Sequence, residues 1–247
     1  MKLGTLYGVG LGSGDPELMT LKAVRILKST KKIAYFSKGG KTGHARSIMA
    51  SYITDWHEEM PLVYPVTTEY PVSDPRYIEL IDDFYEKSCA QIAEHLQSGE
   101  DVAVLCVGDP LFYGSFMHLY RRLKDQFPCE VVAGVTAMAG CSAAALTPLT
   151  WGDDVMTILP ATLPENELLE KLKNTDAAVI MKLGKGFAKA KNAITKAGML
   201  DRAIYVEYGT MENEKILPLK DKIDNHVPYF SLIICQSPKS LHNLASV

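Results

Sequence analysis

Short apolar runs recur along the chain, and between them lie glycine-rich loops or segments whose apolar residues have helical spacing. We expect strands where the runs are shortest and most apolar, and helices where apolar residues recur every three or four positions. The expected strands are 6–11, 33–36, 101–107, 130–132, 177–183, 203–207 and 230–235. The expected helices are 16–28, 77–97, 136–146 and 188–197. Because strands alternate with helices, the pattern predicts an α/β fold.

Two separate strand-helix series flank a segment near residues 114–128. We therefore predict two α/β domains, an N-terminal one over residues 1–118 and a C-terminal one over residues 119–247. The run 101–107 is apolar after its first residue, which is typical of a strand covered on both faces. Asp15 and Pro16 suit the start of a helix, as N-cap and first-turn residue.

The composition is that of a folded globular protein: 247 residues, of which 47% are hydrophobic and 22% charged. The formal net charge of -3 creates no general attraction for nucleic acid, so an anionic ligand would have to be held by local groups. The longest weakly polar stretch, 131–146, contains glycine, threonine and serine and is shorter than the ~20 apolar residues of a membrane span. We expect a buried helix there and no membrane partner.

The five cysteines are an odd number, are widely scattered and form no C-x-x-C pair. A disulfide framework and a zinc site are both disfavoured, so we expect a reducing cytoplasm and no metal site. His95, His118 and His242 have no companion at metal-ligand spacing, and we expect them to be structural or solvated.

The first expected strand runs into a glycine-rich loop, Gly8-Val9-Gly10-Leu11-Gly12-Ser13-Gly14-Asp15-Pro16. No register of this loop matches the dinucleotide fingerprint G-x-G-x-x-G, because Ser13 or Asp15 stands where the last glycine is required. The acid expected after the second strand is also missing, since that strand ends at Ser37. A nicotinamide site is therefore disfavoured, and the loop alone is equally consistent with a turn that only serves packing.

Two further loops follow strands, Val107–Gly114 and Val132–Ala137. In open α/β sheets ligands bind outside the carboxyl ends of the strands, so both loops stand where a binding site is expected. Asp109 in the first of them has an alternative interpretation, as a cap of the following helix.

Together and in this order, the loops resemble the tetrapyrrole methylase family. Its members transfer a methyl group from S-adenosylmethionine to ring carbons of uroporphyrinogen, precorrins or cobalt-precorrins. The resemblance covers essentially the whole chain. It rests on the first glycine loop with Leu18-Met19-Thr20-Leu21-Lys22-Ala23, on Gly108-Asp109-Pro110, on Gly134-Val135-Thr136-Ala137, and on Glu207-Tyr208-Gly209-Thr210.

The resemblance implies two α/β domains with S-adenosylmethionine in the cleft between them, S-adenosylhomocysteine as product, and commonly a homodimer. The stretches 41–47, 64–69 and 108–116 are most similar to members that methylate precorrin-2 at carbon 20, giving precorrin-3A in cobalamin biosynthesis. The same reaction on cobalt-factor II in the anaerobic pathway is the alternative. A further alternative is a module that binds S-adenosylmethionine but does not catalyse methyl transfer.

Matching motif to motif, the resemblance implies cofactor contacts, mainly through the backbone, at Val107, Gly108, Asp109, Phe112, Thr136, Ala137, Leu183 and Gly209. The first glycine loop would border the tetrapyrrole, whose carboxylates call for a basic rim. The expected substrate-binding residues are Gly12, Ser13, Gly14, Asp15, Lys38, Lys41, His44 and Arg46. An ordinary solvated charged loop is the competing interpretation of the last four.

The methylated ring must lose a proton, so a base is expected to help. The candidates are His44, Glu69, Tyr64 and Tyr113, or water, and the sequence does not rank them. The uroporphyrinogen methylases carry an Asp at the position of Phe36, so their acid-base assignment does not carry over to this chain.

Overall fold

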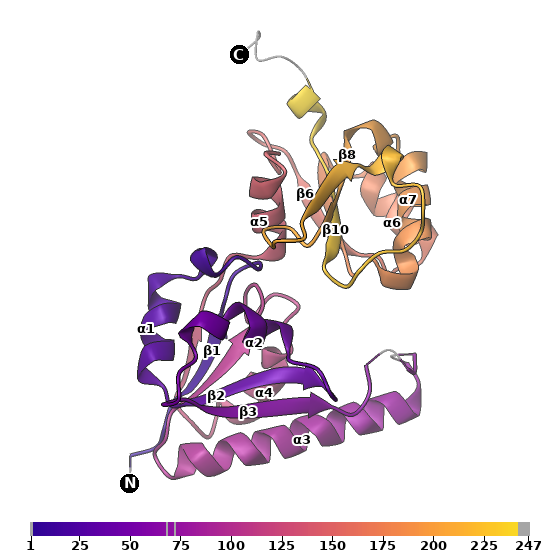
Figure 1. Ribbon diagram of the computed structural model, residues 1–247. Helices are drawn as coiled ribbons and strands as arrows, with labels where there is room; N and C mark the ends of the chain where they lie inside the picture. The colour runs from indigo at the N-terminus through magenta and orange to yellow at the C-terminus, as the bar shows by residue number, and fades with distance from the viewer. Residues whose placement is uncertain (1, 68, 72, 242–247) are drawn as a thin grey trace. The chain divides into compact units, whose positions relative to one another are not determined.

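The computed structural model describes residues 2–67, 69–71 and 73–241, and the side chains up to residue 239. The chain divides into two compact units, Met1–Thr136 (unit 1) and Ala137–Val247 (unit 2). Each unit has its own five-stranded sheet with helices packed against it (Figure 1). The expected fold class, two α/β domains, is confirmed.

The domain boundary expected between residues 118 and 119 is wrong. It falls inside helix α4 (Phe116–Leu123), which leads to strand β5 (Cys129–Val132). Strand β5 pairs in parallel with β1 (Leu6–Gly10), so both elements belong to unit 1. The strand pattern could not reveal this, because a strand's own sequence does not state which sheet it joins.

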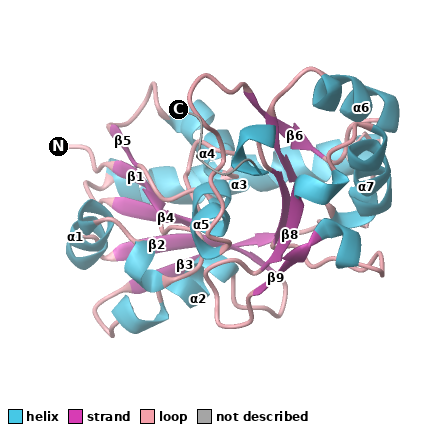
Figure 2. Ribbon diagram, turned by 90° about the horizontal axis from the view of Figure 1, so that it is seen from above, coloured by secondary structure: helices cyan, strands magenta, loops and turns pink. Residues whose placement is uncertain are grey.

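The sheet of unit 1 is wholly parallel, with strand order β3-β2-β4-β1-β5. Its remaining strands are β2 (Lys32–Lys38), β3 (Glu58–Tyr64) and β4 (Val102–Cys106). Every residue of β4 is buried, as expected for a strand covered on both faces. Since all five strands run the same way, their carboxyl ends lie at one edge of the sheet (Figure 2).

Helices cover both faces of this sheet. On one face α1 (Leu21–Ser29) and α2 (His44–Ile48) form a core with the strands. On the other face α3 (Pro75–Gln97) and α4 do the same. Two short 3-10 helices, η1 (Pro16–Leu18) and η2 (Ala50–Tyr52), complete the unit.

The helix expected over 16–28 is two separate elements. Asp15 accepts a hydrogen bond from the N–H of Glu17 (2.8 Å) and so caps only the 3-10 helix η1. Thr20 then caps α1, because its Oγ1 accepts from the N–H of Ala23 (3.1 Å). The apolar spacing continues across the break, so the periodicity alone suggests one continuous helix. Only the second capping residue, Thr20, marks the start of a new helix.

Unit 2 holds a mixed sheet of order β6-β7-β10-β8-β9. Strands β6 (Met156–Pro160) and β7 (Ala177–Met181) are parallel. Strand β10 (Ser231–Cys235) is antiparallel to both β7 and β8 (Ala203–Glu207), and β9 (Lys215–Pro218) is antiparallel to β8. Strands β7 and β8 therefore run the same way, and their carboxyl ends lie at the same edge.

On one face of this sheet α6 (Glu165–Lys173) and α7 (Phe187–Lys196) lie side by side (Figure 1). The other face packs against α5 (Ala137–Ala144), in which Gly140 and Cys141 are the buried residues. The expectation of a buried helix over 136–146 thus holds for one side of α5 only. Short 3-10 helices stand at Gly184–Gly186 (η3), Leu200–Arg202 (η4), Leu219–Asp221 (η5) and Pro238–Leu241 (η6).

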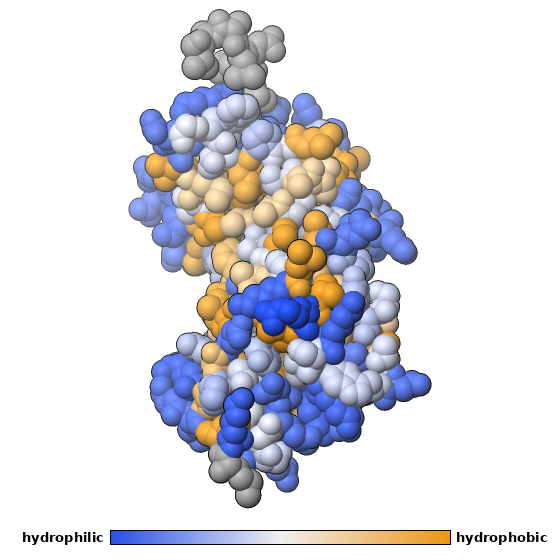
Figure 3. Space-filling view, turned by 90° about the vertical axis from the view of Figure 1, so that its left-hand side faces the viewer, coloured by the Kyte–Doolittle hydropathy of each residue, from blue (hydrophilic) through white to orange (hydrophobic). Residues whose placement is uncertain are grey.

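Hydrophilic side chains cover much of unit 1 on the face drawn in Figure 3, and apolar ones appear there in smaller groups. Among the described residues no helix is long and apolar enough to cross a bilayer.

Candidate functional site

Three loops of unit 1 leave the sheet at its carboxyl edge: 11–15 after β1, 107–115 after β4 and 133–136 after β5. Strands β1 and β4 are neighbours, but the chain continues from β1 to β2 on one side and from β4 to β5 on the other. Such a change of direction is the point of an open parallel sheet where ligands bind. The fold thus brings the three loops predicted from sequence to one binding edge.

The first two loops are joined by backbone hydrogen bonds. The N–H of Gly108 donates to the carbonyl of Gly12 (2.7 Å), and the N–H of Leu11 donates to the carbonyl of Cys106 (2.9 Å). Gly12 and Gly108 both have positive φ, 81° and 72°, where a side chain would be strained. The pairing therefore depends on glycine at both positions.

The third loop packs against these two without any side chain between them. A Cβ added to Gly134 would lie 2.1 Å from the carbonyl oxygen of Gly108. A Cβ added to Gly10 would lie 2.7 Å from that same oxygen and from the nitrogen of Gly134. All three loops therefore meet through their backbone, with no side chain at the points of closest approach.

Asp109 ties the second loop to the third. Its Oδ1 accepts from the N–H of Leu111 (2.9 Å) and its Oδ2 accepts from the N–H of Gly134 (3.1 Å). Helix α4 begins after Ser115, which occupies its N-cap position, so the capping role considered for Asp109 does not apply. The carboxylate shapes the site, and a cofactor contact at this residue would have to come from its backbone.

Strained backbone gathers around the expected cofactor residues. Among the described residues that are not glycine, five have positive φ. Four of these adjoin an expected cofactor contact: Tyr113 (55°) next to Phe112, Lys182 (56°) next to Leu183, and Tyr208 (50°) and Thr210 (68°) on either side of Gly209. The fifth is Leu146 (48°). Such conformations cost about 1–3 kcal/mol each and cluster at functional sites.

In unit 2 the expected cofactor residues follow the carboxyl ends of β7 and β8, at the same sheet edge. Leu183 is 1% exposed and packs in the core, so only its backbone is available to a ligand. A Cβ on Gly209 would lie 2.4 Å from Sγ of Cys141 in α5, so the turn after β8 packs closely on that helix. Thr136 and Ala137, both half-buried, stand at the start of α5.

The expected basic rim is partly neutralised. Arg46 makes two hydrogen bonds to Glu59 of β3, from Nε (2.6 Å) and Nη2 (2.9 Å). Lys38 pairs with Glu69 (2.5 Å) and donates to Thr67 (2.9 Å). The sequence could not show the pairing of Arg46, because the pattern over 58–64 does not predict the strand that carries Glu59.

Several expected substrate residues make contacts within the loops themselves. The carbonyl of Gly12 accepts a hydrogen bond from Gly108, and Asp15 caps η1. Gly14 has a positive φ of 150°. Ser13 is buried. Lys41 and His44 are exposed, on the loop after β2 and at the start of α2. Of the stretch 64–69 that carried part of the resemblance, Thr68 lies outside the described residues.

Two of the four candidate bases are tied into the fold. The Tyr64 hydroxyl donates to Oγ of Ser115 (2.5 Å) and lies 3.3 Å from that of Tyr85. The carboxylate of Glu69 binds Lys38 and the N–H of Thr67. Tyr113 is 43% exposed. Desolvation, and secondly the charge of Lys41, lower the pKa of His44, which keeps its imidazole neutral and able to accept a proton at pH 7.

Phe36 belongs to an aromatic cluster between the sheet and α3. Its ring stacks on Tyr64 (5.5 Å between centroids) and lies near Phe84 and Tyr85. An aromatic side chain thus packs where the uroporphyrinogen methylases place an acid, so this position supplies no base. The sequence signal for the cluster is the run of aromatic residues on one side of α3.

His118 extends this cluster, because its ring stacks on Tyr85 at 4.3 Å. Burial, and then the charges of Arg122 and Arg121, lower its pKa. The unfolded chain therefore binds a proton here more readily than the folded one, and protonation destabilises the fold. We expect the free energy of unfolding to fall between pH 7 and pH 5, and to fall less in His118→Phe, which keeps the stack. Denaturant titrations over this range test it; parallel curves for the two proteins would contradict it.

His95 pairs with Glu100 (2.7 Å), and His242 lies outside the described residues. All five cysteines are free thiols. No group of three or more potential metal ligands occurs in the part of the chain that the structure describes.

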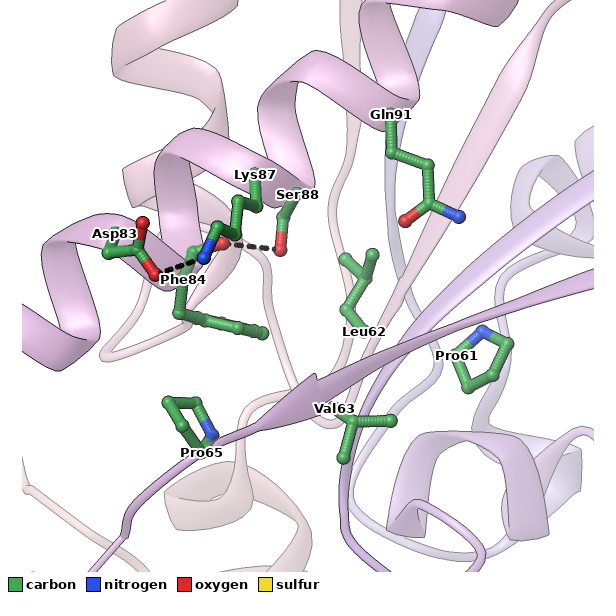
Figure 4. A pocket seen from close by; sticks show the side chains of 9 residues that line it. All are labelled: Pro61, Leu62, Val63, Pro65, Asp83, Phe84, Lys87, Ser88 and Gln91. Carbon is green, nitrogen blue, oxygen red and sulfur yellow. Dashed lines mark hydrogen bonds and ion pairs between the residues drawn. The ribbon is translucent and has the colours of Figure 1, made fainter.

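A groove between β3 and α3 is lined by the side chains drawn in Figure 4. Its charged residues, Asp83 and Lys87, pair with each other at 2.7 Å. It shares no residue with the three glycine loops, and we assign it no part in the site. Its lining is Pro61, Leu62, Val63, Pro65, Asp83, Phe84, Lys87, Ser88 and Gln91.

Comparison with known proteins leads to the same family that the loops resemble. The family model described as Tetrapyrrole (Corrin/Porphyrin) Methylases matches residues 5–222. The chain is 49% identical to a precorrin-2 C(20)-methyltransferase of Sinorhizobium sp over 94% of this chain and 95% of that protein. It is 28% identical to a cobalt-precorrin-2 C(20)-methyltransferase of Salmonella typhimurium over 94% of this chain and 95% of the other. The fold resembles that of a Thermus thermophilus uroporphyrin-III C-methyltransferase complexed with S-adenosylhomocysteine (TM-score 0.63, 20% identity, 94% and 97% of the two chains).

Proposed function

Because the chain belongs to the tetrapyrrole (corrin/porphyrin) methylase family, we propose that it transfers the methyl group of S-adenosylmethionine to carbon 20 of precorrin-2 in cobalamin biosynthesis. The observation that carries this proposal is the 49% identity to a precorrin-2 C(20)-methyltransferase along nearly the full length of both chains. Methylation of the cobalt-bearing ring remains the alternative, since relatives named for that substrate also match along the chain, at 28% and 31% identity.

The loop residues fit S-adenosylmethionine. Its adenosine and methionine groups need hydrogen-bond donors and acceptors, and Gly10, Gly108 and Gly134 bring three backbone segments together where a Cβ on Gly10 or Gly134 would not fit. We assign cofactor binding to the backbone of Val107, Gly108, Asp109, Phe112, Thr136, Ala137, Leu183 and Gly209. S-adenosylhomocysteine is then the product.

The cofactor supplies a methyl group that is already activated by its positively charged sulfur. The protein chiefly has to hold the reacting ring carbon in line with the methyl group and to keep water out. The backbone contacts among the three loops and the hydrogen bonds of the Asp109 carboxylate fix the loops before substrate binds. His44 is the candidate base whose protonation state suits removal of the ring proton, and water remains the alternative.

We keep all the expected substrate residues as the binding site for the tetrapyrrole, but we expect them to contribute unequally to its affinity. The glycine-loop residues Gly12, Ser13, Gly14 and Asp15 would border the tetrapyrrole. Lys38 and Arg46 carry charges that are already shared with carboxylates. Lys41 is an exposed cation for which the described residues supply no ion pair. We therefore place the strongest attraction for the ring carboxylates at Lys41.

Replacing Lys41 by alanine is expected to raise KM for the tetrapyrrole about fivefold, since one exposed charge contact is worth up to about 1 kcal/mol. The Kd for S-adenosylmethionine should stay unchanged. As a matched cation, Arg46→Ala should instead lower the free energy of unfolding by roughly 1 kcal/mol, because Glu59 loses both hydrogen bonds. Steady-state kinetics with calorimetry separates the two effects, and equal loss of substrate and cofactor affinity in Lys41→Ala would contradict the assignment.

We further propose a homodimer in a reducing cytoplasm. Support for the compartment comes from the cysteines, all five of which are free thiols. Analytical ultracentrifugation of the purified protein tests the dimer.

The direct test of function is incubation of the purified protein with S-adenosylmethionine and either precorrin-2 or cobalt-factor II without oxygen. A gain of one methyl group on the metal-free ring supports the proposal, whereas a gain on the cobalt ring alone transfers the protein to the anaerobic reaction. Binding of S-adenosylmethionine with no methylation of either ring would contradict the substrate assignment.

A further inference from the structure

A buried polar cluster stands directly before the strained turn 208–210 of unit 2. Glu207, the last residue of β8, is 7% exposed. Its Oε1 accepts a hydrogen bond from the Tyr205 hydroxyl (2.6 Å), and the ammonium groups of Lys222 and Lys215 lie 4.0 and 3.7 Å from its two oxygens. A buried carboxylate is tolerated only with such partners, so its position is closely defined.

The main cationic partner is itself fixed. Lys222 is 8% exposed and donates to Oδ1 of Asp224 and to the carbonyl of His226, both at 2.8 Å. Its ammonium also lies 5.4 Å from the centre of the Tyr205 ring. Burial, and then the Glu207 hydrogen bond, raise the pKa of Tyr205, so its phenol remains the donor. The cluster is a connected network, and none of its members is among the expected site residues.

The cluster lies on the opposite side of β8 from α5, directly before the turn 208–210. Along β8, Tyr205 packs on the side of α7, whereas Val206 packs on the side of α5. Since side chains alternate along a strand, Glu207 shares the side of Tyr205. Gly209 of the turn thus packs closely on Cys141 at one face of the sheet, and the Glu207 network lies at the other face, directly before the turn.

The turn needs such support. Tyr208 and Thr210 both have positive φ, and a backbone of this kind persists only where its surroundings fix it. Backbone hydrogen bonds also tie the turn: the N–H of Tyr208 donates to the carbonyl of Phe230 (2.8 Å), the N–H of Met211 donates to the carbonyl of Tyr208 (2.8 Å), and the N–H of Thr210 donates to Oε2 of Glu214 (2.6 Å).

We propose that Glu207 is a positioning residue for the cofactor: its buried carboxylate, held by Tyr205 and Lys222, keeps the turn 208–210 in the conformation that binds S-adenosylmethionine. This inference rests on the proposed function, because the cofactor contact at Gly209 is part of it.

The test compares Glu207→Gln and Tyr205→Phe with a matched control, Asp154→Asn. The Asp154 side chain is 1% exposed and pairs with Lys239 (2.7 Å), so it is also a buried, ion-paired carboxylate of unit 2. It precedes β6, which is parallel to β7, and therefore lies at the opposite edge of the sheet from the turn. Tyr205→Phe removes one hydroxyl and serves if Glu207→Gln fails to fold.

We expect Glu207→Gln to raise the calorimetric Kd for S-adenosylhomocysteine about tenfold and Tyr205→Phe to raise it roughly threefold, as is typical for loss of hydrogen bonds to a charged group. KM for the tetrapyrrole should be unchanged in both. Asp154→Asn should lower Tm without changing this Kd. In the ligand-free protein, amide hydrogen exchange at residues 208–211 should be faster in Glu207→Gln and unchanged in the control.

A fall in Tm in both carboxylate variants with no change in Kd or in exchange would overturn the proposal, because the network would then serve stability alone. If the unsubstituted protein binds no S-adenosylhomocysteine, the proposed function fails. If exchange at residues 208–211 were nevertheless faster in Glu207→Gln, the Glu207 network would stabilise the turn for a reason unrelated to this cofactor. The positioning role would then be overturned as well.

Discussion

Gly134→Ala is expected to weaken S-adenosylmethionine binding by about 100-fold or more, the largest loss we foresee for a single methyl group. The added Cβ would lie 2.1 Å from the carbonyl oxygen of Gly108 and 2.9 Å from Cα of Gly10, and both are backbone atoms. Backbone cannot yield as a flexible side chain does, so the loop after β5 must move away from the other two. The hydrogen bond from Gly134 to Asp109 would be lost with it.

Isothermal calorimetry with S-adenosylmethionine measures this loss, and Tm measures the accompanying destabilisation. Gly39→Ala is the matched control for both readouts, because a Cβ on Gly39 meets nothing within 4 Å and Gly39 is not among the positive-φ glycines. If Gly134→Ala binds the cofactor as well as the unsubstituted protein, the meeting of the three loops is not the cofactor site.

Gly209→Ala should raise the Kd for the cofactor about tenfold and lower the free energy of unfolding by about 1–3 kcal/mol, the usual cost of overpacking. The new Cβ would lie 2.4 Å from Sγ of Cys141, so the turn after β8 would be pushed off α5. Here the obstructing atom belongs to a side chain and can be removed.

Adding Cys141→Ala to Gly209→Ala should therefore restore most of the affinity, since the nearest remaining contacts are Cγ1 of Val206 at 3.0 Å and Cβ of Cys141 at 3.3 Å. The four proteins form a double-mutant cycle in which the two changes are strongly coupled. Additive losses would mean that contact between the turn and α5 does not set cofactor binding.

The features that the sequence predicts correctly are those that depend on local pattern. The apolar run at 101–107 is the wholly buried β4, and the glycine spacing locates the loops that meet at the carboxyl edge of unit 1. Glycines at such contacts leave a trace in the sequence because no other residue fits. For the same reason the residues of these loops are enough to identify the resemblance to the methylase family.

Features that depend on long-range pairing cannot be predicted in this way. Strand β3 begins with two glutamates and carries Pro61, so the pattern does not predict it, and Arg46 resembles a free cation in the sequence although Glu59 of β3 binds it. The expected domain boundary falls too early because the pairing of β5 with β1 spans more than a hundred residues of chain. The roles of Asp109 and Tyr64 likewise become visible only with their partners, Gly134 and Ser115.

The position of the new methyl group is the sharpest test of methyl transfer to carbon 20 of precorrin-2. Purified protein would be incubated under anaerobic conditions with precorrin-2 and S-adenosylmethionine carrying an isotopically labelled methyl group, and the product examined by NMR. We expect one labelled methyl group, attached to carbon 20. A label at any other ring carbon, or an unmodified ring in the presence of bound S-adenosylmethionine, would contradict it.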